Sequence, residues 1–180
     1  MRGVSSRFER IAVETVYNGG FFTVNRERFR HEDGAEVERE IVRHTGAVGI
    51  VVLDGDQLWL VRQPREAIDS PDLLELPAGK LDEEGESPLD TAKRELAEEI
   101  GKQADHWEPL GSFYTSPGFT DEEVHLFLAT GISDAGERPA VHEDERIDVE
   151  VRPLGDLDAI LAETKDSKTL IGLYALRARL

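Results

Sequence analysis

The 180-residue sequence contains no cysteine, and this absence excludes both disulfide bonds and catalysis by a thiol. Long apolar runs are missing as well, since no stretch approaches the roughly 20 apolar residues that a membrane-spanning helix needs. The first residues lack the continuous apolar segment of a secretory signal peptide. Internal repeats and low-complexity segments are also lacking. From these absences we expect a cytoplasmic protein with no membrane partner.

Positive charge is scarce relative to negative charge. The chain has 21 lysine and arginine residues against 38 aspartate and glutamate residues, so its net charge is -17. A field of this sign repels polyanions, and we therefore expect no binding to nucleic acid. A substrate that carries phosphate groups would need a metal ion to screen it. Hydrophobic residues make up 39% of the chain, which is enough for one main core.

A short helix is predicted between Ser87 and Gly101. Ser87 is a favoured N-cap residue, the proline after it suits the first helical position, and Asp90 completes the spacing of a capping box. Gly101 stands where helices commonly end. We therefore expect a helix from about Pro88 to Ile100. Its apolar stripe consists of Leu89, Ala92, Leu96 and Ile100.

Three carboxylates share an adjacent arc of this helix, those of Glu95, Glu98 and Glu99. Like charges at these spacings are neighbours and destabilise a helix by a few tenths of a kcal/mol per pair. A hard divalent cation such as Mg²⁺ prefers carboxylate oxygens and would offset that cost. Arg94 lies four residues before Glu98 and is placed to orient or neutralise part of the cluster. The alternative is a solvated acidic helix face, which is the commoner meaning of such a segment.

The segment from Gly79 to Gly101 resembles the Nudix box, in which a glycine and a glutamate precede the pattern Arg-Glu-hydrophobic-X-Glu-Glu-X-Gly. The matching residues are Gly79, Glu86, Arg94, Glu95, Leu96, Glu98, Glu99 and Gly101. Eight specified positions at fixed spacing arise by chance with odds well below about one in a million. Two features depart from the family pattern. The gap from Gly79 to Glu86 is one residue longer than usual, and Lys102 stands where a hydrophobic residue is normal.

The resemblance implies a fold of the α/β class, a Nudix-type α-β-α sandwich with a mixed central sheet. It also implies a site for Mg²⁺ or Mn²⁺, because family members hold such ions with the box glutamates and with the carbonyl before the box glycine. The metal ligands expected on this basis are the Ala78 carbonyl and the carboxylates of Glu95, Glu98 and Glu99. Glu98 is expected to share a second ion, and Glu86 to orient the site through Arg94.

A general base is also needed if the chain activates a water molecule. In the pyrophosphatases that this sequence resembles, a glutamate on the loop before the last strand supplies it. Glu143 and Glu145, in the segment HEDERIDV, stand at matching positions. The two are nearly equal candidates, and a solvated acidic loop is the alternative.

Outside the box, the chain is similar to the ADP-ribose pyrophosphatase branch of the family. LPAGK leads into the box, and Pro117 lies fifteen residues past Lys102. Gly118, in the same turn, is a candidate for substrate binding. This resemblance implies metal-dependent hydrolysis of ADP-ribose to AMP and ribose 5-phosphate. The alternatives are hydrolysis of another nucleoside diphosphate sugar, such as GDP-mannose, and a module that senses a nucleotide without cleaving it.

The first part of the chain is predicted to form an antiparallel β meander. Residues 8–44 alternate in character and are interrupted by turns at Asn18-Gly19-Gly20 and Asp33-Gly34. They offer too few apolar positions for a core of their own, so we expect them to rest on the main domain or on a second subunit. We therefore expect a homodimer. The predicted division is a meander of residues 1–44, acting as a dimerisation and substrate arm, and a Nudix hydrolase domain of residues 45–180.

Substrate contacts are expected from two regions. An adenine ring stacks on an aromatic face or a guanidinium plane. The meander offers Phe21, Phe22 and Arg28 for this purpose, and Arg39 and Glu40 as weaker candidates. A predicted hairpin, Gly46–Asp54 with Gln57–Gln63, leads to Arg62 and Arg65, where a cation can meet a phosphate. The alternative for each arginine is a solvated charge at the end of a strand.

The remaining elements are expected to build the core. Residues 66–74 are predicted to be a loop. The further strands and helices are predicted over Trp107–Thr115, Glu123–Thr130, Ile147–Leu154, Leu154–Glu163 and Ser167–Leu180, the last capped by Ser167.

Overall fold

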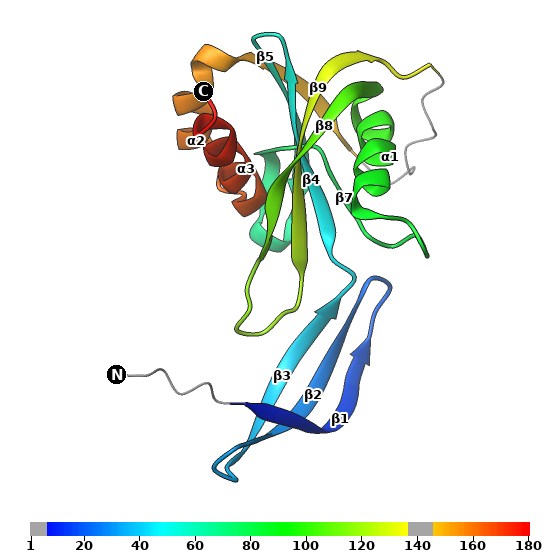
Figure 1. Cartoon of the computed structure of the whole chain (residues 1–180), viewed down its shortest axis with the longest axis vertical. Coiled ribbons are helices and arrows are strands. Elements are labelled where there is room, and N and C mark those ends of the chain that lie inside the picture. Colours follow the sequence, from blue (N-terminus) through cyan, green and yellow to red (C-terminus); the bar gives the residue numbers. More distant parts are fainter. Residues whose placement is uncertain (1–6, 137–145) are drawn as a thin grey trace. The chain divides into compact units, whose positions relative to one another are not determined.

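The computed structural model describes residues 7–136 and 146–180. The chain divides into two compact units (Figure 1). The first contains the chain up to Thr45 together with Tyr114–Glu123. The second contains Gly46–Phe113 and Val124–Leu180.

The first unit is built on a three-stranded antiparallel sheet. Its strands are β1 (Phe8–Asn18), β2 (Phe22–His31) and β3 (Glu36–His44), in the order β1-β2-β3. This arrangement confirms the predicted meander. The segment 114–123 is fastened to β3, since the amide of Val42 donates to the carbonyl of Phe119 at 2.8 Å.

An ionic cluster replaces an apolar core in this unit. The carboxylate of Glu27 is fully buried and accepts hydrogen bonds from Arg43 at 2.6 and 2.8 Å, from Arg10 and from Asn25. Arg43 also donates to Asp121 at 3.0 Å. Strands β2 and β3 and the segment 114–123 are therefore joined by charge. Several large apolar side chains stay exposed instead, among them Phe8, Val13, Tyr17, Phe21 and Phe119.

The second unit contains a mixed sheet in the order β10-β5-β4-β9-β8, with β6 paired to β5 and β7 paired to β4. The strands are β4 (Ala47–Asp54), β5 (Gln57–Arg65), β6 (Ser70–Glu75), β7 (Ala78–Lys80), β8 (Lys102–Tyr114), β9 (Glu123–Asp134) and β10 (Asp148–Pro153). Strand β4 runs parallel to β9 and antiparallel to β5 and β7. Tyr114, the last residue of β8, and Glu123, the first residue of β9, are counted with the first unit.

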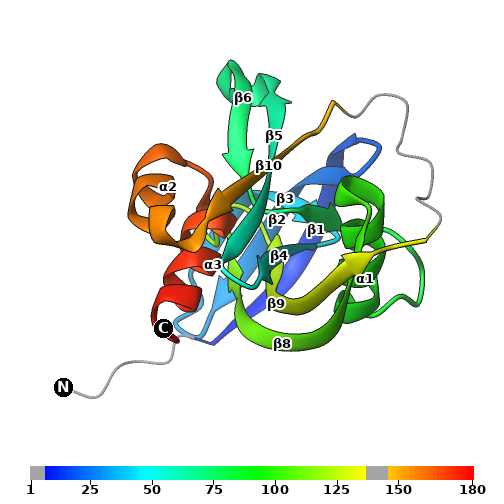
Figure 2. The same cartoon turned by 90° about the horizontal axis from the view of Figure 1, so that it is seen from above.

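Helices cover both faces of this sheet. Figures 1 and 2 show α1 (Pro88–Ile100) on one side and α2 (Leu157–Glu163) and α3 (Ser167–Arg177) on the other. Strand β4 shows why both faces are covered, because successive side chains of a strand point to opposite faces. Val48, Ile50 and Val52 join the apolar cluster that includes α1, whereas Val51 joins the cluster that includes α2 and α3. The expected α-β-α sandwich is thus confirmed.

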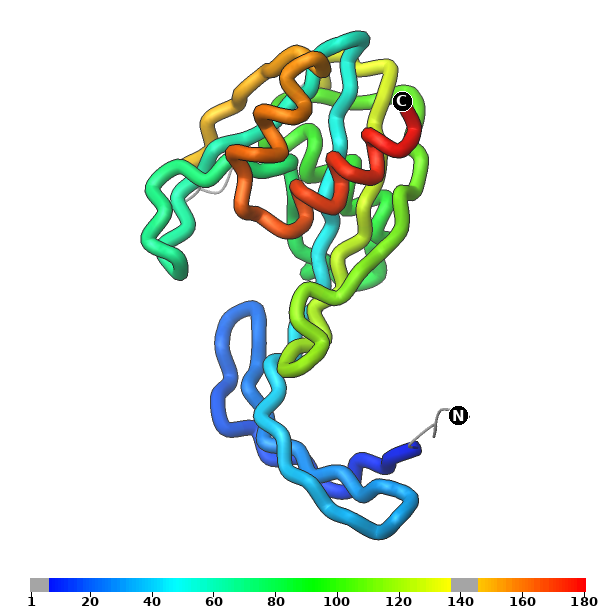
Figure 3. The backbone as a smooth tube through the Cα atoms, turned by 90° about the vertical axis from the view of Figure 1, so that its left-hand side faces the viewer, coloured from blue at the N-terminus to red at the C-terminus, as the bar shows by residue number. Residues whose placement is uncertain are grey.

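Helices α2 and α3 lie side by side against the sheet (Figure 3). Close packing at α3 depends on Gly172, because a Cβ atom built there would lie 2.7 Å from Leu76. Within the described part of the chain, no helix is long and apolar enough to cross a membrane.

Several predicted boundaries need correction. Helix α3 is capped by Asp166, whose carboxylate accepts from the amide of Thr169 at 2.9 Å, and not by Ser167. The predicted loop 66–74 contains a 3-10 turn, Glu66–Ile68, and most of β6. Strand β8 begins at Lys102, five residues earlier than expected. A 3-10 turn, Leu154–Asp156, precedes α2.

The buried carboxylate of Glu27 should make the stability of the protein depend on pH. The hydrogen bond from Arg43 lowers the pKa of Glu27 below that of an ordinary glutamate. Its ionised form therefore contributes stability that is fully present above pH about 4.3 and is lost as the pH falls through the folded-state pKa. In urea unfolding, Glu27→Gln should lower the free energy of unfolding by about 1–3 kcal/mol at pH 7. The difference in the free energy of unfolding between Glu27→Gln and the wild type should become smaller below pH about 4. A difference that stayed constant down to pH 3 would contradict this role.

Candidate active site

The acidic helix α1 forms as its local sequence predicts. The amide of Asp90 donates to the hydroxyl of Ser87 at 3.2 Å, and that hydroxyl donates to the Asp90 carboxylate at 2.6 Å. Gly101 ends the helix with φ of 68°, a left-handed conformation that favours glycine, and its amide donates to Ala97 at 3.0 Å. The expected cap and stop are both confirmed.

Arg94 gathers three carboxylates around one guanidinium group. Its Nη1 donates to Glu95 at 2.8 Å and to Glu98 at 3.0 Å. Its Nε and Nη2 donate to Glu86 at 3.1 to 3.3 Å. The hydroxyl of Thr91 donates to Glu86 as well, at 2.9 Å. The predicted contact between Glu86 and Arg94 is therefore present in the structure.

These contacts shift the pKa values of the cluster. The hydrogen bond from Arg94 is the main reason that the pKa of Glu86 lies below its ordinary value. Burial lowers the pKa of Arg94, but the hydrogen bond to Glu86 and the charges of Glu95, Glu86 and Glu98 raise it by more. The guanidinium therefore stays charged and serves as the counter-cation of the cluster.

Glu99 lies on the buried side of the acidic arc and is only 5% exposed. Its carboxylate accepts a hydrogen bond from the amide of Ala78 at 2.9 Å. Ala78 is the first residue of β7, which pairs with β4 in the central sheet. The structure thus brings together two of the residues that the sequence proposes as metal ligands.

Gly79 allows the close approach of Glu95. A Cβ atom built on this glycine would lie 2.0 Å from the carboxylate carbon of Glu95 and 2.1 Å from Oε1. Any side chain here would displace the Glu95 carboxylate. A close contact therefore explains why a glycine stands at this position.

The cluster suits a hard divalent cation by the chemistry of its donors, which are carboxylate oxygens beside a backbone segment. Among the residues that the structure describes, no three acidic or histidine side chains already lie in an arrangement that would hold an ion. The reason is visible at Arg94, whose Nη1 contacts both Glu95 and Glu98. Glu95 and Glu98 would be available to hold a metal ion only if this nitrogen moved away from them. Glu143 and Glu145 lie outside the described residues.

The two arginines at the end of β5 have different surroundings. Arg62 is paired with Glu150 and Glu163, and it also donates to the carbonyl of Asp72 at 3.1 Å. This pairing gives Arg62 a structural role and does not support phosphate binding, which stays a prediction. Arg65 is held instead by Glu75, and the hydrogen bond that Arg65 donates to Glu75 is the main reason that the pKa of Arg65 is raised. The charge of Glu99 raises it further, so Arg65 belongs to the surroundings of the acidic helix.

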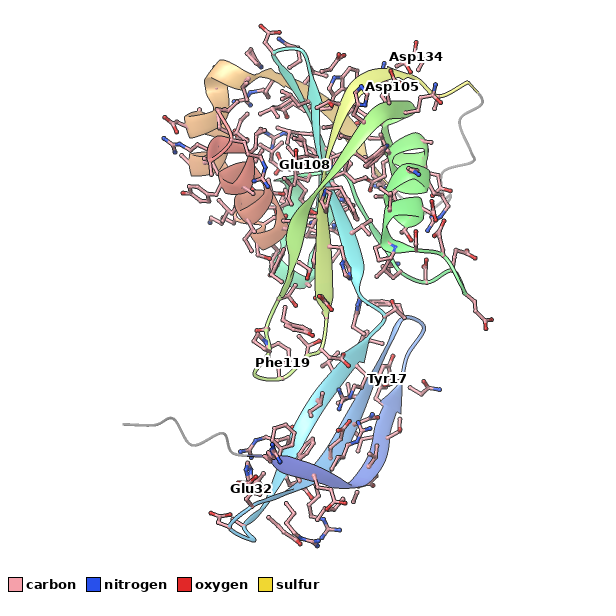
Figure 4. All side chains as sticks on the ribbon, in the orientation of Figure 1. Tyr17, Glu32, Asp105, Glu108, Phe119 and Asp134 are labelled. Carbon is pink, nitrogen blue, oxygen red and sulfur yellow. The ribbon has the colours of Figure 1, made fainter. Side chains whose placement is uncertain are left out.

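The other substrate candidates belong to the first unit. Arg39 and Gly118 line a pocket of about 320 Å³ together with Phe8, Phe29 and Phe119. Figure 4 labels Phe119, which is 54% exposed. The ring of Phe22 lies 5.0 Å from that of Phe21, and Glu40 lies opposite Arg26 in the sheet. Substrate binding by these residues stays a prediction.

Lys102 departs from the usual box, and the structure shows how the position is filled. Its ammonium group lies 4.5 Å from the centre of the Trp59 ring and 2.6 Å from the carboxylate of Asp134. Asp134 is labelled in Figure 4. An aromatic face and a carboxylate therefore accommodate the charge.

Sequence reasoning missed Glu75 and Lys168. Both are nearly buried, and their side chains contact each other across 93 residues of sequence. A charged residue inside the apolar run LLELP is a signal that would have identified Glu75, whereas nothing local distinguishes Lys168.

Comparison with known proteins agrees with this geometry. The NUDIX domain family matches residues 43–173. Proteins described as ADP-ribose pyrophosphatases are 39% identical in Mycobacterium tuberculosis, over 95% of this chain and 84% of that protein, and 38% identical in Bacillus subtilis, over 94% and 92%. A protein of Bacillus methanolicus described as a methanol dehydrogenase activator is 36% identical, over 93% of this chain and 91% of that protein.

A solved structure shares the fold. It is described as an ADP compounds hydrolase and superposes with a TM-score of 0.85 at 26% sequence identity, covering 97% of this chain and 94% of that chain.

Gly79→Ala tests the close contact with Glu95. The new methyl group should push the carboxylate aside, and the affinity for Mn²⁺ in calorimetry should fall about 10- to 100-fold, the usual effect of disturbing groups that orient metal ligands. The free energy of unfolding should fall by only about 1 kcal/mol, because the end of the Glu95 side chain can move. Gly155→Ala is the matched control, since nothing lies within 4 Å of a Cβ atom at that exposed position. Unchanged Mn²⁺ affinity in Gly79→Ala would show that the contact does not matter.

Proposed function

The chain belongs to the NUDIX domain family, and we propose that it hydrolyses the pyrophosphate of ADP-ribose to AMP and ribose 5-phosphate. The observation that carries this proposal is the acidic cluster around Arg94 of α1, which contacts Glu95 and Glu98 of the same helix and Glu86 just before it. Glu99 is bonded to the amide of Ala78 beside this cluster. Relatives that span nearly the whole chain are described as ADP-ribose pyrophosphatases, which supports the choice of substrate.

Mg²⁺ is the proposed cofactor, with Mn²⁺ as a substitute. The residues that would hold it are Glu95, Glu98, Glu99 and the carbonyl of Ala78. When bound, the ion would neutralise phosphate charge and lower the pKa of a bound water. Arg94 keeps Glu95 and Glu98 oriented, and its own position is fixed by Glu86. In this proposal, Mg²⁺ would replace the guanidinium of Arg94 as the cation that Glu95 and Glu98 contact.

Two further groups complete the proposed reaction. Arg65 would bind a phosphate oxygen, because its side chain is 42% exposed and it interacts electrostatically with Glu99 of the acidic helix. Glu143 or Glu145 would accept a proton from the attacking water. Sensing without cleavage is disfavoured, because a binding module has no need for the complete glutamate set.

We also propose a cytoplasmic homodimer in which residues 1–44 supply the dimerisation and substrate arm, with Phe22, Arg39 and Glu40 as substrate contacts. The sheet of the first unit supports this view. It exposes Phe8, Tyr17 and Phe21 and has an ionic rather than an apolar interior. Covering such aromatic side chains is a common basis of stable dimers.

A panel of nucleoside diphosphate sugars, assayed with Mg²⁺ and with identification of products, tests the activity. We expect AMP and ribose 5-phosphate from ADP-ribose, at a kcat/KM well above that for GDP-mannose. Glu99→Gln should lower kcat about 10³-fold or more, because the amide is a poor ligand for Mg²⁺, while its oxygen can still accept from Ala78 and preserve the fold. Tight binding of ADP-ribose without release of AMP would favour a sensor. Full activity of Glu99→Gln would remove that residue from the metal site.

The identity of the base is tested by Glu143→Gln and Glu145→Gln. Removing a general base should lower kcat about 10²- to 10⁴-fold and abolish the acidic limb of the pH-rate profile. We expect one variant to show this loss and the other to stay within a few fold of wild type. Equal mild effects in both variants would place the base elsewhere.

A further inference from the structure

The segment that leads into the acidic site is fastened at three successive residues to the α2–α3 junction. The hydroxyl of Thr164 donates to the carbonyl of Leu74 at 2.8 Å, and the amide of Leu76 donates to the hydroxyl of Thr169 at 2.8 Å. Between them, the carboxylate of Glu75 contacts the ammonium group of Lys168. Thr164 and Thr169 are both buried. The path from β6 to Ala78 is therefore fixed by groups about 90 residues away in sequence.

Glu75 uses its remaining hydrogen-bonding capacity on Arg65. Its Oε1 accepts from Arg65 Nε at 2.6 Å, and its Oε2 accepts from Arg65 Nη2 at 2.8 Å. The side chain of Glu75 is 1% exposed, whereas that of Arg65 is 42% exposed. A two-point contact of this kind fixes the plane of the guanidinium as well as its distance. The Nε and Nη2 atoms of Arg65 are thus held by Glu75, while the side chain as a whole remains partly exposed to solvent.

One nitrogen of Arg65, Nη1, takes no part in the contact with Glu75. Among the described residues, its Nη1 makes no hydrogen bond, while Nε and Nη2 are both occupied by Glu75. A buried carboxylate with two cations is a costly way to stabilise a core, because apolar replacements are often neutral or stabilising. Lys168 is shared with Asp166 at 3.1 Å, so the cluster is close to neutral without any ligand. The arrangement leaves one donor nitrogen available for an anion.

We infer that Glu75 is a positioning residue for the phosphate-binding step. It holds Arg65 by Nε and Nη2 so that Nη1 is presented to a phosphate oxygen of the substrate, and Lys168 holds Glu75 in turn. This inference rests on the proposed function, since it assigns Arg65 to the pyrophosphate of the substrate. A purely structural role for Glu75 is the competing explanation.

The variants Glu75→Gln, Arg65→Ala and the double variant separate these explanations. Calorimetry with two probes, the α,β-methylene analogue of ADP-ribose and inorganic pyrophosphate with Mg²⁺, measures binding without turnover. We expect Glu75→Gln to weaken both probes about 10-fold, because Gln keeps at most one of the two contacts to the guanidinium. The double variant should bind as weakly as Arg65→Ala alone, because Glu75 acts through Arg65.

Thr164→Val is the matched control. It removes the hydrogen bond that the Thr164 hydroxyl donates to the carbonyl of Leu74 and the one that it accepts from the amide of Asp166. Neither of these bonds involves Arg65 or Glu75. We expect its urea midpoint to fall to an extent similar to that of Glu75→Gln, with both probe affinities unchanged. If Thr164→Val lowered the affinity for both probes as much as Glu75→Gln does, Glu75 would only stabilise the segment, and the inference would be overturned.

Two other results would also overturn it: wild-type affinity for both probes in Glu75→Gln, or losses that multiply in the double variant. Failure of the proposed function is distinguishable from these. Suppose that the wild type binds pyrophosphate but not the ADP-ribose analogue, and that Glu75→Gln weakens the binding of pyrophosphate. ADP-ribose would then be ruled out as the substrate, while the positioning role of Glu75 would stand.

Discussion

The mutual repulsion of carboxylates on one short helix is the constraint on which this structure depends. Glu95, Glu98 and Glu99 are neighbours on α1, and in the described structure two of them bind Arg94 while the third is buried against the amide of Ala78. Each of these carboxylates therefore has a partner within the chain, and in the proposed function a divalent ion would take the place of some of these contacts. The contacts with Arg94 keep Glu95 and Glu98 ordered, and carboxylates that are already ordered would bind a metal ion with a smaller loss of entropy.

The rest of the second unit holds in place helix α1 and the segment that ends at Ala78, which meet at the hydrogen bond between Ala78 and Glu99. Helix α1 is held by its apolar stripe against one face of β4, and α3 packs on the opposite face. Through Thr169 and Lys168, α3 also holds the segment that ends at Ala78. The carboxyl-terminal helices, which the sequence predicts only as part of the core, are therefore connected to this segment by hydrogen bonds. The first unit relies on charge instead, with the buried Glu27 at its centre.

What the sequence predicted well depended on short-range interactions. The N-cap at Ser87 and the stop at Gly101 are set by neighbouring residues, so both were visible in the local pattern. Arg62 and Arg65 were indistinguishable in sequence because their partners, Glu163 and Glu75, are brought to them only by tertiary folding. The cap of α3 was misassigned because Asp166 and Ser167 are adjacent and both favour that position. Lys168 was missed since its contact with Glu75 spans 93 residues.

We propose that the carboxylates of α1 exchange Arg94 for a divalent ion. Electron paramagnetic resonance of Mn²⁺ titrated into the wild type, Glu95→Gln and Glu99→Gln tests it directly, because free and bound Mn²⁺ give different signals. We expect the wild type to bind Mn²⁺ saturably and to release it when Mg²⁺ is added, and we expect each variant to lose at least 10-fold in Mn²⁺ affinity. Equal Mn²⁺ affinity in all three proteins would contradict it.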